Sequence, residues 1–236
     1  MRTLAKDARS AAALVLLALA ACGGAEPRSP ARDAAAPALV TLASAPGPGP
    51  DRLRAGDLAG ARAAFEADLG RNPDGLGALN DLAVSYLLQG HSDAASRLLD
   101  EVVAKGNLGD QQAALVNLGE LYATQGYVSA AQAYLDTASS LDPSRPEPWY
   151  ALAVLADARG ELERARAALR EALARDDGGA ARSALAYLYP EERVHLEALV
   201  AEQAGDGATA ADRWRALAAG RFPALAAAAE RHLAGE

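Results

Sequence analysis

A motif of three residues recurs five times along the chain and constrains its fold more than any other feature. In each copy, a glycine is followed five residues later by an alanine and four residues after that by a large apolar residue. A glycine can adopt a positive φ and end a helix. The alanine and the large residue then share one face of the next helix. The copies are Gly56-Ala61-Phe65, Gly90-Ala95-Leu99, Gly126-Ala131-Leu135, Gly160-Ala165-Leu169 and Gly205-Ala210-Trp214, with glycine spacings of 34, 36, 34 and 45 residues.

The composition agrees with a stack of helices, and the net charge disfavours two kinds of binding partner. Alanine and leucine, which are strong helix formers, dominate the 236 residues, and aromatic residues make up only 5%. Strands favour the aromatic and β-branched residues that are scarce here, so we expect an all-α fold. The formal net charge of -8 disfavours binding to nucleic acid or to anionic lipid surfaces.

A second pattern precedes the motif glycines. Leu82-Ala83 and Tyr86 stand before Gly90, Leu118-Gly119 and Tyr122 before Gly126, and Trp149 and Leu152-Ala153 before Gly160. With the period near 34 residues, this pattern resembles the tetratricopeptide repeat family over roughly residues 51–220. The resemblance implies a right-handed superhelical solenoid of antiparallel helix pairs with a C-terminal capping helix.

The repeat boundaries follow from the motif and the prolines. We expect units at about 76–109, 112–145, 146–177 and 190–220, and a capping helix at 222–234. The first unit should contain only its second helix, at about 52–70, because three prolines (Pro46, Pro48 and Pro50) stand where its first helix would run. An insertion occupies 176–190, and Glu197 replaces the leucine of the other units.

The N-terminus resembles the precursor of a bacterial lipoprotein. Basic residues precede the apolar run Ala11–Ala21, which has the length of a signal-peptide core. The sequence Leu19-Ala20-Ala21-Cys22 matches the lipobox, which implies cleavage of residues 1–21 and lipidation of Cys22. The alternative is an ordinary secretory signal in which the only cysteine of the chain occurs there by chance. Gly23 follows the cysteine, and the resemblance then implies the outer membrane, facing the periplasm.

Residues 22–50 are predicted to be an extended tether. Six of the twelve prolines of the chain lie in this stretch among small residues. Such a composition buries too little apolar surface to offset the entropy lost on ordering.

Motifs for catalysis, cofactors and metals are missing from the sequence. It contains no phosphate-binding loop, no His-Glu-x-x-His and no Gly-x-Ser-x-Gly. His91, His195 and His232 lie in different units, so we expect surface or turn histidines and neither a metal site nor a cofactor. These observations favour a protein that is not an enzyme.

In the family, the first helix of each unit lines a concave groove, and the resemblance assigns nine residues to its exposed positions. Most are apolar and none is basic, so the groove should suit an amphipathic helix or an extended apolar segment rather than a terminal carboxylate. The alternative for Leu87 and Leu88 is that they pack against neighbouring helices. The nine are Asn80, Val84, Leu87, Leu88, Val116, Glu120, Tyr150, Val154 and Asp157.

Two functions remain open from the sequence. The first is a lipid-anchored adaptor or assembly factor that binds another envelope protein or peptide. Lipid-anchored tetratricopeptide proteins of this size resemble factors that help pilus secretins to assemble, and adaptors that bring proteases to cell-wall hydrolases. The second is an enzyme or small-ligand receptor with a site near the insertion at 176–190.

Overall fold

The structure is a computed structural model, and it describes residues 39–44, 46–187 and 189–235. The expected signal peptide, Cys22 and the tether as far as residue 38 lie outside these residues. In the described part, no helix is both long enough and apolar enough to cross a membrane.

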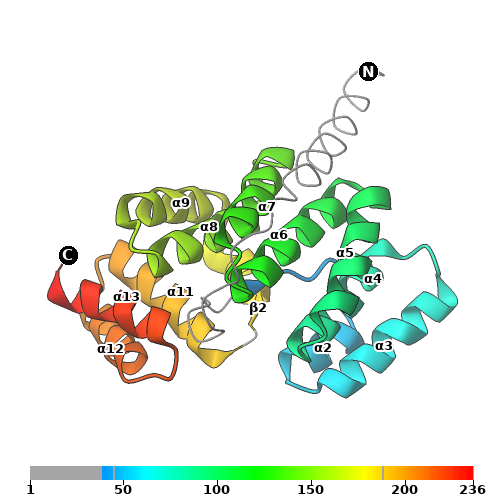
Figure 1. The fold of residues 1–236 in the computed structure, drawn as a ribbon, viewed down its shortest axis with the longest axis horizontal. Helices are drawn as coiled ribbons and strands as arrows, with labels where there is room; N and C mark the ends of the chain where they lie inside the picture. Colours follow the sequence, from blue (N-terminus) through cyan, green and yellow to red (C-terminus); the bar gives the residue numbers. More distant parts are fainter. Residues whose placement is uncertain (1–38, 45, 188, 236) are drawn as a thin grey trace.

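The chain forms a solenoid of antiparallel helix pairs (Figure 1). Each pair packs on the next along the array, so the expected all-α solenoid is confirmed. The first helices of the pairs are α2 (Pro48–Arg54), α4 (Leu76–Leu88), α6 (Leu108–Thr124), α8 (Glu147–Ala158) and α11 (Pro190–Gln203). The second helices are α3 (Leu58–Arg71), α5 (Ser92–Lys105), α7 (Val128–Leu141), α9 (Leu162–Arg175) and α12 (Gly207–Ala218).

Shorter elements complete the array. The insertion contains the 3-10 turn η2 (Asp177–Gly179), α10 (Ala180–Ala184) and the short strand β2 (Ala186–Tyr187). Strand β1 (Leu39–Val40) pairs with β2, and α13 (Pro223–Ala234) closes the C-terminal end. Helix α13 packs on α12, as a capping helix should, and also contacts α8.

The motif residues have the roles that their chemistry predicts. All five motif glycines have a positive φ, between 77° and 82°. The five alanines that follow are at most 4% exposed, and the five large residues at most 2% exposed. Helices α6 and α7 approach so closely that a Cβ on Gly119 would lie 2.8 Å from the Leu135 side chain. Small residues at the crossing therefore set the spacing within a pair.

The first unit differs from the expectation of a single helix at about 52–70. It has a short first helix, α2, because Pro48 and Pro50 lie in the first turn. Amide groups there have no partner within the helix, so a proline removes no hydrogen bond.

The predicted tether also ends earlier than residue 50. Residues 39–44 pack inside the array, and Leu39 and Val40 are each 1% exposed. The composition of residues 22–50 as a whole did not indicate that the short apolar run Leu39–Val40 is buried, because the residues that it packs against lie far along the chain.

The fifth unit keeps the register of the others despite Glu197. The neighbouring Leu196 and Ala198 are fully buried. The Glu197 carboxylate is paired with Arg193 at 3.0 Å and with Arg213 at 3.2 Å, at the surface of the helix pair.

Candidate functional site: the concave face

The concave face is covered by other parts of the same chain. Of the nine predicted groove residues, eight are at most 5% exposed and Leu88 is half-buried. The expectation that they are exposed therefore differs from the structure. Residues 39–44 lie over α4 and α6, and α10, α11 and α13 contact α8.

Leu87 and Leu88 belong to the core of the N-terminal half. Leu87 is 5% exposed and lies in a cluster with Val40, Phe65 and Val84, and Leu88 packs against that cluster. The structure thus favours the alternative in which these two leucines pack against neighbouring helices.

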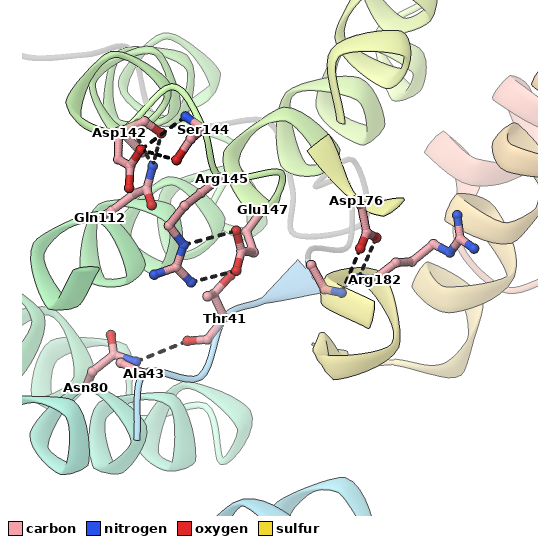
Figure 2. Close-up of polar contacts among 12 residues, drawn as sticks. Thr41, Ala43, Asn80, Gln112, Asp142, Ser144, Arg145, Glu147, Asp176 and Arg182 are labelled. Atoms are coloured by element: carbon pink, nitrogen blue, oxygen red, sulfur yellow. Dashed lines mark hydrogen bonds and ion pairs between the residues drawn. The ribbon is translucent and has the colours of Figure 1, made fainter. Parts of the chain in front are cut away.

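Residues Leu39–Ser44, which we call the N-terminal segment, are bound through their main chain. The Thr41 amide donates to Asn117 Oδ1 at 2.8 Å, and Asn117 Nδ2 donates back to the Thr41 carbonyl at 2.9 Å. Asn80 Nδ2 donates to the same carbonyl at 3.1 Å (Figure 2). Asn117 Nδ2 also reaches Asn80 Oδ1 at 3.0 Å, so the two amides orient each other.

Asp81 holds the other end of the N-terminal segment. Its carboxylate accepts the Ala43 amide at 2.7 Å and the Ser44 amide at 3.2 Å, and it also accepts the Ser44 hydroxyl. Burial raises the pKa of Asp81, while these hydrogen bonds act in the opposite direction. Asn80 and Asp81 are both fully buried, so α4 commits two polar side chains to this contact.

The insertion completes the enclosure of the N-terminal segment. Strands β1 and β2 are antiparallel, with Leu39 opposite Tyr187 and Val40 opposite Ala186. Asp176 shapes the insertion by accepting the amides of Ala181 at 2.8 Å and Arg182 at 2.9 Å (Figure 2).

Asp176 also accepts the Tyr150 hydroxyl at 2.9 Å, which ties the insertion to α8. Burial and this hydrogen bond raise the pKa of Tyr150. These contacts give the insertion at 176–190 a structural role.

Glu120 is the most unusual of the predicted groove residues. It lies on α6 and is 4% exposed. Burial, reinforced by the nearby charge of Glu192, raises the pKa of Glu120 well above its usual value.

A buried polar cluster lies at the C-terminal end of the concave face. His195 Nε2 is 2.7 Å from Asp157 Oδ2, and His232 Nε2 is 2.7 Å from Asp157 Oδ1. His232 Nδ1 pairs with Glu202 Oε2 at 2.7 Å, and Trp214 Nε1 donates to the same oxygen at 3.0 Å. The Trp214 and His232 rings stack with centroids 4.1 Å apart.

These contacts correct the expectation of surface or turn histidines. His91 is exposed at the start of α5, but His195 is fully buried and the His232 side chain is only 4% exposed. The motif glycine could have located part of the cluster. His195 lies ten residues before Gly205, as Asn80 and Tyr150 lie ten before their own glycines.

The cluster is held by charge. Burial disfavours the Asp157 carboxylate, but the hydrogen bonds from His195 and His232 outweigh it and hold the pKa of that carboxyl well below its usual value. Burial alone would lower the pKa of His232, but hydrogen bonds and charge from Asp157 and Glu202 raise it. Helix α13 is therefore attached to α8 through Asp157 and to α11 through Glu202.

A small cleft opens beside this cluster, between α8, α9, α11 and α13. Its lining includes Asp157, Arg166, Leu169, Glu202 and His232, and none of its lining residues belongs to the insertion. Over the described ranges, no group of three or more His, Cys, Asp or Glu residues is arranged to hold a metal ion. The contacts around Asp157 and His232 join helices across the array.

The chain is similar to other solved structures, and one of them, TTC0263, supports the fold. A thermophilic TPR protein from Thermus thermophilus, TTC0263, is 24% identical over 79% of this chain and 95% of its own, with a TM-score of 0.51. A crystal structure of MamA is 20% identical over 81% of this chain and 99% of its own, with a TM-score of 0.43.

No curated protein matches the chain significantly. The model of the family described as "Tetratricopeptide repeat" matches residues 52–118 and 122–188, which is more than half of the chain. Proteins with this fold are in general non-catalytic scaffolds that bind other proteins. The chain therefore belongs to the tetratricopeptide repeat family.

Proposed function

We propose that this protein is a non-catalytic adaptor or assembly factor of the bacterial envelope, which binds an extended segment of another protein on its concave face. The observation that carries the proposal is the N-terminal segment itself. Asn80, Asp81 and Asn117 already hold an extended stretch of polypeptide by its main chain. A surface that binds one such stretch has the geometry to bind another.

The lipobox supports a membrane anchor for this adaptor. Acylation of Cys22 contributes about 0.8 kcal/mol for each buried methylene group, so two or three chains hold a protein durably. Gly23 after the cysteine supports the outer membrane, with the array facing the periplasm. A role beside pilus secretins or cell-wall hydrolases follows from the resemblance to lipid-anchored proteins of this size.

Membrane fractionation tests the anchor. Cys22→Ser should release the protein from membranes or leave an uncleaved precursor, whereas Ser10→Ala, within the signal peptide, should fractionate like the wild type. A Cys22→Ser protein that is processed and still fully membrane-bound would show that lipid on Cys22 is not the anchor.

Site-specific photocrosslinking in intact cells tests the binding face. A photoreactive residue at Tyr187, on β2 beside the N-terminal segment, should crosslink to another envelope protein. The matched control is Glu163, an exposed residue on α9, which is the second helix of its pair. A photoreactive residue at Glu163 should capture no partner. If Glu163 captures the partner and Tyr187 does not, the adaptor binds through its convex side and the concave face is not the site.

A further inference from the structure

The hydrogen bonds that hold the N-terminal segment do not depend on most of its side chains. Asn117 and Asn80 bind the amide and carbonyl of Thr41, and Asp81 binds the amides of Ala43 and Ser44. Only the Ser44 hydroxyl adds a side-chain bond. A different sequence can form the same main-chain bonds, provided that no proline replaces a donor at the third, fifth or sixth position.

Apolar side chains fix which sequences fit. Leu39 lies in one core cluster with Val116, and Val40 lies in a second with Val84 and Leu87. Leu42 packs against the second cluster and is half-buried. A fitting segment therefore carries aliphatic residues at its first, second and fourth positions.

The third residue of the N-terminal segment, Thr41, fits its site poorly. Thr41 is 4% exposed, and its hydroxyl is buried with no hydrogen-bond partner among the described residues. A buried hydroxyl without a partner is unfavourable, and valine has the same shape without the polar atom. A segment with valine at this position should bind more tightly.

The connection to the array offsets this mismatch. The segment is separated from the start of α2 by only three residues, 45–47. Its binding is therefore intramolecular, at an effective concentration on the order of millimolar. The N-terminal segment therefore covers the apolar surface although Thr41 fits poorly. A segment of another protein that fits better can still compete with it for the same site.

We infer that the N-terminal segment is an exchangeable ligand within the chain, which an extended segment of a partner protein displaces. The partner's segment has aliphatic residues at its first, second and fourth positions, an apolar residue such as valine at its third, and a hydroxyl residue at its sixth. This inference rests on the proposed function and names the class of its partner. It also makes partner binding conditional on release of the N-terminal segment.

Peptide binding to the full-length protein in detergent tests the exchange. The probe is a fluorescent peptide of residues 39–44 with capped ends and the change Thr41→Val. Thr41→Pro in the protein removes the amide that binds Asn117, so its affinity for the probe should rise on the order of tenfold or more over the wild type. Thr41→Val in the protein tightens the built-in segment, so its affinity should fall by a similar factor. The Thr41→Pro/Asn117→Ala double variant should lose the gain.

Thr41→Val keeps the inference testable even if Thr41→Pro fails to fold, because valine preserves the shape of the side chain. Equal probe affinity in the wild type and Thr41→Val would overturn the inference. It would leave the proposed function standing, because a partner could still bind the concave face beside an N-terminal segment that stays in place. The inference would also be overturned if Thr41→Pro formed dimers whose share rises with protein concentration and which the probe does not dissociate. The site would then belong to a second copy of this chain. If the peptide series behaves as expected but Tyr187 captures no envelope protein, exchange of the N-terminal segment stands and the proposed envelope partner is ruled out.

Discussion

Replacing Asn117 with alanine should loosen the N-terminal segment without unfolding the array. Asn117 makes two hydrogen bonds to Thr41, at 2.8 and 2.9 Å, across 76 residues of sequence. The Thr41 carbonyl keeps its bond from Asn80, but the Thr41 amide is left buried without a partner. The substitution also removes the hydrogen bond from Asn117 to Asn80 on α4, but it leaves the contacts of α6 with α7 unchanged.

The size of the effect follows from these contacts. A hydrogen bond contributes a net of about 1 kcal/mol, and a buried amide left unsatisfied costs about 1–3 kcal/mol. Asn117→Ala should therefore disfavour docking by about 2–4 kcal/mol, which raises the undocked population roughly 30- to 700-fold. Burial of Leu39 and Val40 still contributes about 1.5–3 kcal/mol for each side chain. The segment should remain mainly docked but open far more often.

Amide hydrogen exchange measures this opening directly. The amides of Thr41, Ala43 and Ser44 should exchange faster by the predicted factor, because exchange follows the local opening equilibrium. Amides in α8 and α9 should keep their wild-type rates.

The control is Asn107→Ala at the start of the same helix. Asn107 caps α6 by accepting the amides of Gly109 and Asp110 at the surface, and its loss costs about 1 kcal/mol. It should leave exchange in the N-terminal segment unchanged. The reasoning is refuted if Asn117→Ala also leaves it unchanged, or if both variants accelerate the segment equally.

Three further predictions concern the array and its C-terminal end. Ala131→Leu, at a fully buried helix crossing, should lower the free energy of unfolding by about 1–3 kcal/mol in chemical denaturation; a wild-type value would contradict the close crossing. Gly90→Ala should lower the free energy of unfolding by about 1–2 kcal/mol, because the φ of Gly90 is +80°. Gly70 is helical and has equally free space for a Cβ, so Gly70→Ala should raise the free energy of unfolding by about 0.5–1 kcal/mol. Equal shifts in melting temperature for the two variants would rule out the argument from φ. The pKa of His232 is raised by Asp157 and Glu202, so its contribution is complete below pH 6.5 and is lost as pH rises through the folded pKa. Hydrogen exchange in α13, corrected for intrinsic rates, should therefore show more frequent opening as the pH rises through the folded pKa of His232, and His232→Gln should remove this dependence.

The repeat pattern predicted most of the fold because its information is local. A glycine at a helix end, an alanine five residues later and a large residue four further on act within one helical hairpin. The structure bears out the positive φ of all five glycines and the burial of all five alanines. Prolines misled the prediction in the first unit, where Pro48 and Pro50 fall in the first turn of α2, and in the tether, which was expected to extend to residue 50.

The candidate site was less predictable. The family register assigned residues such as Asn80 and Asp157 to exposed positions of the concave face, but it did not indicate that other parts of the chain bury them. The sequence Leu39–Ser44 carries no local signal for the helices it binds. The same applies to His195 and His232, which meet at Asp157 across 38 and 75 residues.

The sequence alone therefore determined most of the helices and their pairing within units, since these depend on contacts within about 34 residues. Only the tertiary structure decided that the concave face is filled from within. That outcome depends on long-range contacts, from Thr41 to Asn117, from β1 to β2 and from α13 to α8. Such contacts form only after the array has brought distant main-chain donors, acceptors and polar side chains to one surface, and no short stretch of sequence encodes them.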